Sequence, residues 1–156
     1  MVYAEANTQG SSEVLYDFRE TYMPEDEAGT LMPFTPNDPN FNRQWSLKNT
    51  GTSIQGSGTP DADIDADLAW DITTGSSSIK IANIDGGVDN NHPEFSGRLS
   101  GDPDNNFTDL KGTFVAGISA AKGNNSIGIA GVAYNANLLE VSTGFETASQ
   151  FAIAIN

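Results

Sequence analysis

The run Ile79–Ile84 (IKIANI) is followed at once by Asp85-Gly86-Gly87, and no other feature of the sequence constrains the fold more strongly. A short run rich in β-branched residues that stops at a glycine pair is typical of a buried strand ending in a tight turn. In an open α/β sheet, ligands and catalytic groups gather at the carboxyl ends of the strands. Asp85 is therefore the first candidate for a functional residue.

A helix and a second strand follow this first strand. Thr108 or Asp109 can cap a helix that we predict from about 111 to 121. That helix contains an apolar stripe (Phe114, Val115 and Ile118) and small residues that permit close packing (Gly112, Ala116, Gly117 and Ala120). Residues 137–141 (NLLEV) predict a second parallel strand, and residues 148–155 predict a final helix. The order strand, helix, strand, helix indicates a parallel α/β sheet with right-handed crossovers.

The first part of the chain has a different composition. Residues 1–36 contain seven acids and one base, a balance that predicts an acidic N-terminal extension. We assign residues 37–156 to a single α/β domain, because a chain of 156 residues has room for one ordinary domain. Leu68, Ala69, Trp70 and Ile72 predict a short helix near the start of this domain.

The charge of the chain excludes some partners and favours others. Its 21 acids and 7 bases give a net charge of −14, which repels phosphate backbones and anionic membrane surfaces. We therefore expect no nucleic-acid partner. The same field attracts cations, and loops rich in Asp and Asn offer the hard oxygen ligands that calcium prefers.

Composition also bears on chemistry and location. The chain has no cysteine, so it has neither a disulfide framework nor a cysteine nucleophile. Its first residues lack the basic and apolar regions of a signal peptide, although a leader could have been removed from a precursor. No run of residues is long and apolar enough to predict a membrane span.

Four motifs occur in order along the chain: PNDPNFNRQW from Pro36, IANIDGGVDNNHPEF from Ile81, KGTFVAG from Lys111 and NNSIGIAGVAYNANLLEV from Asn124. Together they resemble the subtilase family of serine proteases, most closely its subtilisin-like and thermitase-like members. The resemblance runs from Pro36 to Asn156 and implies the N-terminal portion of a catalytic domain. The expected fold is thus a truncated, partial subtilisin-like parallel sheet with flanking helices.

The resemblance assigns family positions to individual residues. Asp85 matches the aspartate of the catalytic triad. The family's HGTHVAG motif reads KGTFVAG here, so Lys111 stands at the position of the general-base histidine and Phe114 at that of the second histidine. The motifs that hold the family's serine nucleophile and its oxyanion-hole asparagine come later than Asn156.

Lys111 changes the chemistry that this position can perform. A triad needs an imidazole that takes a proton from the serine and returns it to the leaving amine. A lysine has an ordinary pKa of about 10.4, and a neighbouring Asp85 favours its charged form. We therefore predict an ion pair and no peptide hydrolysis by this chain alone. The single histidine, His92, matches a family position with a structural role.

The resemblance also implies a calcium site. In thermitase-like relatives a site of this kind links the N-terminal segment to a distant loop. Residue by residue, the implied ligands are the side chains of Asp38, Glu94 and Asn125 and the carbonyls of Lys122, Ile127 and Ile129. Six hard oxygens form a shell that calcium accepts. The alternative, in which these residues only form a turn and a cap, stays open.

Three functions remain as hypotheses. The leading one is a catalytically incompetent subtilase-like domain, stabilised by calcium, that acts as a binding or structural component. Its open sheet edge predicts a cover, which is a protein partner, a second copy of the chain or the acidic extension. One alternative is a fragment of a serine endopeptidase whose serine-bearing half comes from another polypeptide, and the other is a calcium-binding module unrelated to proteolysis. The resemblance is compatible with an extracellular or cell-surface location.

Overall fold

The fold of the chain is given by a computed structural model that describes residues 33–53, 56–101 and 110–142. Nearly all of the predicted acidic extension lies outside these described residues. The predicted caps Thr108 and Asp109 and the predicted helix at 148–155 also lie outside them.

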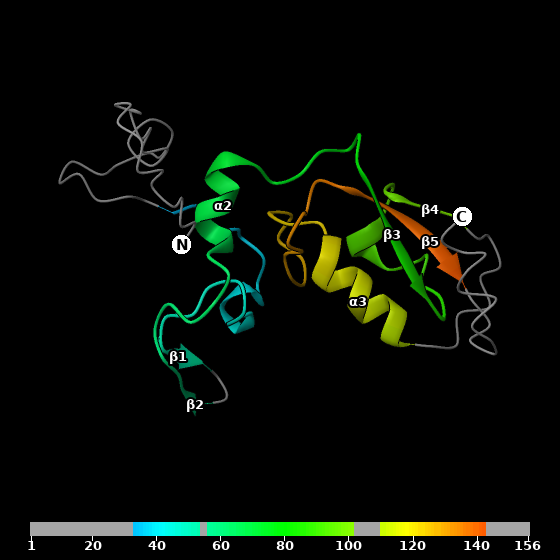
Figure 1. Cartoon of the computed structure of the whole chain (residues 1–156). Coiled ribbons are helices and arrows are strands. Elements are labelled where there is room, and N and C mark those ends of the chain that lie inside the picture. The colour runs from blue at the N-terminus through cyan, green and yellow to red at the C-terminus, as the bar shows by residue number, and fades with distance from the viewer. Residues whose placement is uncertain (1–32, 54–55, 102–109, 143–156) are drawn as a thin grey trace, which may run out of the picture.

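Three parallel strands form the central sheet: β3 (Lys80–Asp85), β5 (Asn137–Ser142) and β4 (Leu99–Gly101), in that order across the sheet (Figure 1). Leu138 of β5 pairs with Ile81 on one side and with Leu99 on the other. Both predicted strands and the parallel α/β class are thereby confirmed. β4 was not predicted, because three residues are too few for a periodic signal.

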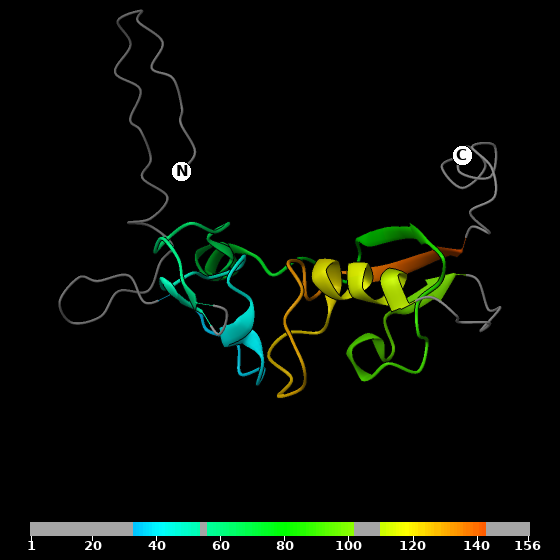
Figure 2. The same cartoon turned by 90° about the horizontal axis from the view of Figure 1, so that it is seen from below.

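Helix α3 (Leu110–Ala120) packs on β3 and β5, as Figures 1 and 2 show. Its predicted bounds are correct to within one residue at each end. The face toward the sheet is built from small residues, and two of them, Ala116 and Ala120, are fully buried. They belong to a core cluster with Val88, Phe95 and Leu138. The predicted apolar stripe of the helix lies on its other side and is exposed to solvent.

The N-terminal half of the described chain contains four short elements. They are η1 (Phe41–Arg43), β1 (Thr52–Ser53), β2 (Gly56–Ser57) and α2 (Ala66–Ile72). The pair β1 and β2 is antiparallel, and α2 confirms the predicted short helix. No helix in the described ranges is long and apolar enough to cross a membrane.

A second core cluster connects this half to the sheet. Trp70 of α2 lies with its ring centroid 5.7 Å from that of Phe41 and 5.2 Å from that of Tyr134. Its indole Nε1 donates a hydrogen bond of 2.9 Å to the carbonyl oxygen of Val132. Because Val132 and Tyr134 belong to the segment between α3 and β5, the cluster holds the two halves together.

Candidate functional site

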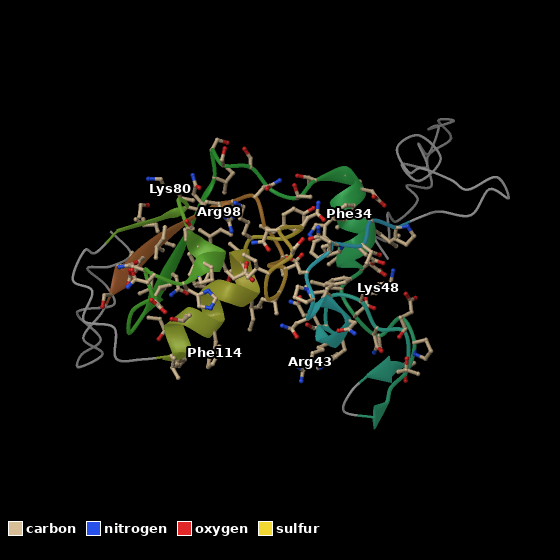
Figure 3. The ribbon with its side chains drawn as sticks, turned by 180° about the vertical axis from the view of Figure 1, so that it is seen from behind. Phe34, Arg43, Lys48, Lys80, Arg98 and Phe114 are labelled. Atoms are coloured by element: carbon tan, nitrogen blue, oxygen red, sulfur yellow. The ribbon has the colours of Figure 1, made fainter. Side chains whose placement is uncertain are left out.

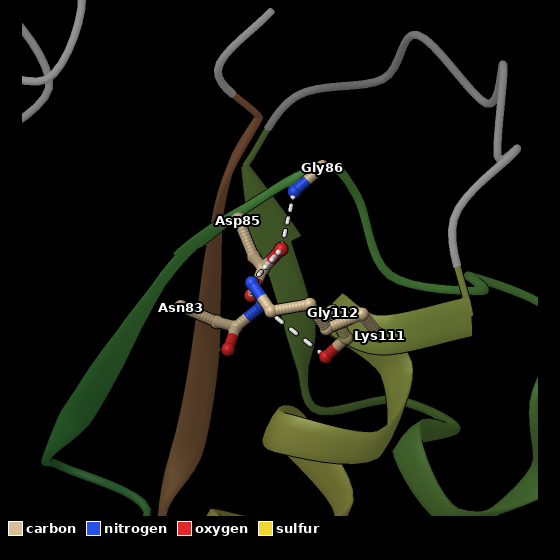
Figure 4. Close-up of polar contacts among 5 residues, drawn as sticks. All are labelled: Asn83, Asp85, Gly86, Lys111 and Gly112. Carbon is tan, nitrogen blue, oxygen red and sulfur yellow. Dashed lines mark hydrogen bonds and ion pairs between the residues drawn. The ribbon is translucent and has the colours of Figure 1, made fainter. Parts of the chain in front are cut away.

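Asp85 and Lys111 meet at the carboxyl end of the sheet (Figure 4). Asp85 is the last residue of β3, and Lys111 is the second residue of α3. The Lys111 Nζ atom lies 3.0 Å from Asp85 Oδ2 and 3.3 Å from Oδ1. The amide of Gly86 donates a 2.8 Å hydrogen bond to Oδ1. The ion pair expected from the sequence is therefore present, with its carboxylate held by two donors.

Small residues allow the helix to begin this close to the strand. A Cβ atom on Gly112 would collide with the carbonyl group of Gly87 and would lie 3.3 Å from the Cβ atom of Asp85. The carbonyl oxygen of Gly112 also accepts a hydrogen bond from the buried Asn83 amide at 3.4 Å. The start of α3 is thus packed directly against the end of β3, and Lys111 is placed over Asp85.

The two partners differ greatly in exposure. The side chain of Asp85 is 8% exposed, whereas that of Lys111 is 67% exposed. An ammonium group has no lone pair, so it donates hydrogen bonds to the carboxylate but does not accept a proton. The pair places an ammonium donor, and not an imidazole, beside the carboxylate at this edge of the sheet.

His92 lies in a different part of the site and has a structural contact. Its Nδ1 atom accepts a hydrogen bond from the amide of Glu94 at 3.4 Å, which caps η2 (Pro93–Phe95). Its ring centroid lies 5.4 Å from that of Phe95. This agrees with the structural role that we expected for the single histidine of the chain.

Two polar residues that the sequence analysis missed hold the loop after β3. The carboxylate of Glu140 accepts a 2.7 Å hydrogen bond from the amide of Val88, and Thr113 Oγ1 accepts a 3.0 Å bond from the amide of Asp89. Both Glu140 and Thr113 are buried. The acid between the apolar residues Leu139 and Val141 was the signal that could have identified Glu140.

The three side chains predicted to bind calcium come together from three separate segments. Asp38 Oδ2 accepts a 2.6 Å hydrogen bond from the amide of Asn124, and Asn125 Nδ2 donates a 3.1 Å bond to Glu94 Oε2. Asp38 is 5% exposed and Glu94 is 1% exposed. In the described part of the chain, neither carboxylate forms an ion pair with a cationic side chain.

The residues predicted to supply carbonyl ligands contact Glu94 and Asn125 through their backbone amides. The amide of Lys122 donates to the carbonyl oxygen of Glu94 at 3.2 Å, and that of Ile129 donates to Glu94 Oε1 at 3.1 Å. The amide of Ile127 donates to Asn125 Oδ1 at 2.9 Å.

Two buried carboxylates and one amide oxygen suit a hard cation, although the Asn125 amide would have to turn to present its oxygen. Within the described ranges, no group of three or more His, Asp or Glu side chains could hold a metal. Backbone carbonyls would therefore have to complete the shell.

Arg98 is a further residue that the sequence analysis missed. Its guanidinium donates hydrogen bonds of 2.7 to 3.1 Å to four carbonyl oxygens, those of Glu94, Ala120, Tyr134 and Ala136. Burial lowers the pKa of Arg98 from its ordinary value, and the charge of Glu94 opposes this effect. Arg98 thus joins η2, the end of α3 and the approach to β5. Nothing in the local sequence distinguishes it from a surface arginine.

A parallel sheet with an acid at the carboxyl end of one strand, packed against a helix through small residues, defines an open α/β domain. Residues 76–156 match the subtilase family of peptidases, and the chain belongs to this family.

The chain is 42% identical to a thermophilic serine proteinase of Bacillus sp. (strain AK1) over 131 residues, which cover 76% of this chain and 32% of that protein. It is 41% identical to thermitase of Thermoactinomyces vulgaris over 116 residues, which cover 69% of this chain and 36% of thermitase. The serine protease of Aeromonas sobria, solved in complex with a chaperone, has a similar fold, with a TM-score of 0.67 and 22% sequence identity. The superposition covers 85% of this chain and 25% of the Aeromonas protease. The chain therefore spans about a third of the length of these curated relatives.

Proposed function

We propose that this chain is a subtilase domain that does not hydrolyse peptides through a catalytic triad and acts as a binding or structural component. The observation that carries the proposal is the contact of 3.0 Å between Lys111 Nζ and Asp85 Oδ2. By resemblance, Lys111 stands at the position of the general base. A lysine ammonium has no lone pair with which to accept the serine proton.

The alternative of an endopeptidase fragment completed by a serine-bearing polypeptide makes a different prediction. It requires activity once the missing part is supplied, whereas the ion pair predicts none. Family membership argues against the third hypothesis, a calcium module unrelated to proteolysis. A protein partner agrees with the complex of the Aeromonas protease with its chaperone, and it forms part of the proposal.

Peptidase assays separate these alternatives. The wild-type chain and the Lys111→His variant are each co-expressed with a polypeptide comprising the thermitase segment that the chain does not match, and hydrolysis of a fluorogenic peptide is measured. We expect no hydrolysis with the wild-type chain and measurable hydrolysis with Lys111→His. Adding Asp85→Asn to Lys111→His is expected to lower that activity, since the base then loses its orienting partner.

The outcome that contradicts the proposal is equally specific. Hydrolysis by the wild-type complex that a serine-directed inhibitor abolishes would show that Lys111 supports catalysis. The endopeptidase alternative would then replace the proposal.

We also propose that calcium stabilises the domain through Asp38, Glu94 and Asn125, with carbonyl oxygens of Lys122, Ile127 and Ile129. The support is the burial of two carboxylates that form no close ion pair within the described residues: amide donors hold them, and the charge of Arg98 acts on Glu94 from a longer distance. Bringing such charges out of water is costly unless they are compensated. A bound divalent cation would supply the compensation and link the segment around Asp38 to the loop 122–129.

Thermal unfolding in excess calcium and in excess chelator tests this site. A ligand present at a hundredfold above its dissociation constant stabilises the folded state by about 3 kcal/mol, so the wild-type melting temperature should rise clearly with calcium. Glu94→Gln removes one ligand charge and should abolish most of the rise. Asp61→Asn changes an exposed acid outside the site and should retain the rise. Identical melting of the wild type in calcium and in chelator would exclude the site.

A further inference from the structure

A groove lies in the N-terminal half of the described chain, between η1 and β1. It has a volume of about 460 Å³, within the range of about 300 to 1,000 Å³ that is typical of small-molecule sites. Phe41 and Asn42 of η1 line it, together with Trp45 and Lys48 from the segment that follows. Figure 3 shows Lys48 in this half of the molecule, away from Lys80 of the central sheet.

Trp45 is the exposed aromatic residue of the groove. It is 51% exposed, whereas Phe41 is 5% exposed. The other tryptophan of the chain, Trp70, is buried and its Nε1 donates to Val132. Within residues 33–53, 56–101 and 110–142, no hydrogen bond engages Nε1 of Trp45. Trp45 therefore offers an incoming ligand both an apolar ring face and an N–H donor.

The polar wall of the groove is held in place by local contacts. Asn49 Oδ1 accepts a 2.9 Å hydrogen bond from the amide of Gly51. Gly51 has a φ of 83°, and a Cβ atom there would collide with the ring of Pro60. The hydroxyl groups of Thr50 and Thr52, which line the groove, lie 3.1 Å apart. Because each hydroxyl can both donate and accept, this wall presents paired hydrogen-bonding groups at fixed positions.

The groove has no unpaired charge among the described residues that line it. Lys48 is the one ionisable side chain in that lining, and its Nζ atom lies 2.5 Å from Oδ2 of the buried Asp67. A phosphate or carboxylate ligand would thus lack an available cationic partner, and the net charge of −14 would repel it. These charges favour a neutral ligand.

We infer that this groove binds a neutral saccharide. A sugar ring has an apolar C–H face, which suits the ring of Trp45, and a rim of hydroxyls that donate and accept hydrogen bonds. The side chains of Asn42, Thr50 and Thr52 supply matching donors and acceptors. The inference goes beyond the proposed function, since it does not depend on the contact between Lys111 and Asp85.

Two other ligand classes fit the groove less well. An extended proline-rich peptide docks in grooves lined by several aromatic rings, whereas Trp45 is the one exposed aromatic side chain among the described lining residues. A wholly apolar ligand would cover the amide of Asn42 and the two threonine hydroxyls without giving them hydrogen-bond partners, which is costly.

Titration of the full chain with oligosaccharides tests the inference. The probes are cellotetraose, maltotetraose, mannotetraose and N-acetylated chitotetraose, which are neutral, and tetragalacturonic acid, which is anionic. The chain has two tryptophans, so the two indole N–H signals of a nitrogen–proton correlation spectrum report on Trp45 and Trp70 separately. We expect at least one neutral probe to shift the Trp45 signal saturably and the anionic probe to leave it unchanged.

Variants establish that the ring of Trp45 is the binding platform. Trp45→Ala removes it and should weaken binding by at least about tenfold, whereas Trp45→Phe keeps an aromatic face and should retain most of the affinity. Phe114→Ala removes another exposed aromatic ring, 65% exposed and outside the groove, and should bind like the wild type. Isothermal calorimetry measures the affinities, and circular dichroism establishes that each variant is folded.

Three results would overturn the inference. The first is that no neutral probe shifts the Trp45 signal, and the second is that Trp45→Ala binds as tightly as the wild type. The third is a shift of the Trp45 signal by decaproline or by tetragalacturonic acid without one by any neutral saccharide, because the ligand would then be a peptide or an anion. None of these results bears on peptide hydrolysis, so the inference and the proposed function fail separately.

Discussion

Single residues decide both the chemistry and much of the stability of this domain. Lys111 was identified from its motif, and its contact with Asp85 followed from their family positions. Arg98 has no comparable signal, yet its guanidinium joins four carbonyl groups from three segments of the chain. Its importance comes from where the fold places it.

Replacing Arg98 with methionine should therefore destabilise the domain strongly. Four carbonyl groups would lose a charged donor, and unsatisfied buried acceptors are costly. We expect the free energy of unfolding to fall by about 3 kcal/mol, measured by urea denaturation. Arg43→Met removes an exposed arginine and should change it by less than about 0.5 kcal/mol. Equal losses for both variants would contradict the role of Arg98.

At the scale of elements, helix α3 has one side that packs on the sheet and another side that is exposed to solvent. Its small residues allow it to approach β3 closely, and its large residues point away from the sheet. Two of its glycines illustrate the difference. A Cβ atom at Gly112 would collide with the backbone of Gly87, whereas one at Gly117 would lie 3.6 Å from Ile129 Cδ1, an ordinary contact distance.

Alanine substitutions at these two glycines should consequently have opposite effects. Gly112→Ala forces the start of α3 away from β3, and we expect a loss of about 3 kcal/mol in the free energy of unfolding. Gly117→Ala gains helix propensity without a clash and should be neutral or stabilising by up to about 1 kcal/mol. Chemical denaturation of both variants measures the difference. A stable Gly112→Ala variant would show that the helix and strand are not closely packed.

At the scale of the whole molecule, two core clusters are joined through the segment between α3 and β5. Tyr134 belongs to the cluster that contains Trp70 and Phe41. Burial raises the pKa of Tyr134, and the hydrogen bond with Thr74 opposes this effect. The nearby charges of Asp38 and Asp71 raise the pKa further. The segment that connects the two halves therefore contains Tyr134, whose side chain the fold favours in its neutral form.

This shift predicts a loss of stability at alkaline pH. Because the pKa of Tyr134 is higher in the folded chain than in the unfolded chain, its contribution is complete below the unfolded value of about 10. The contribution is lost as the pH rises through the higher folded value. The free energy of unfolding should therefore fall more steeply above pH of about 10 in the wild type than in Tyr134→Phe. Parallel curves for the two proteins would contradict this prediction.

The sequence by itself determined the α/β class, the two longer strands, the helices α2 and α3 and the pairing of Lys111 with Asp85. It could do so because strand and helix periodicities are local properties and because the motifs keep their order in the family. It also indicated which side chains surround a possible cation, although the binding of calcium stays a proposal.

Only the tertiary structure decided the rest. β4 is defined by its pairing with β5. The role of Arg98 depends on carbonyl groups of three segments, two of which lie more than 20 residues away in the chain. The close contact between the backbones of Gly112 and Gly87 determines which side of α3 faces the sheet. Any side chain at position 112 would collide with the carbonyl group of Gly87. Such contacts join residues far apart in the chain, and no local pattern records them.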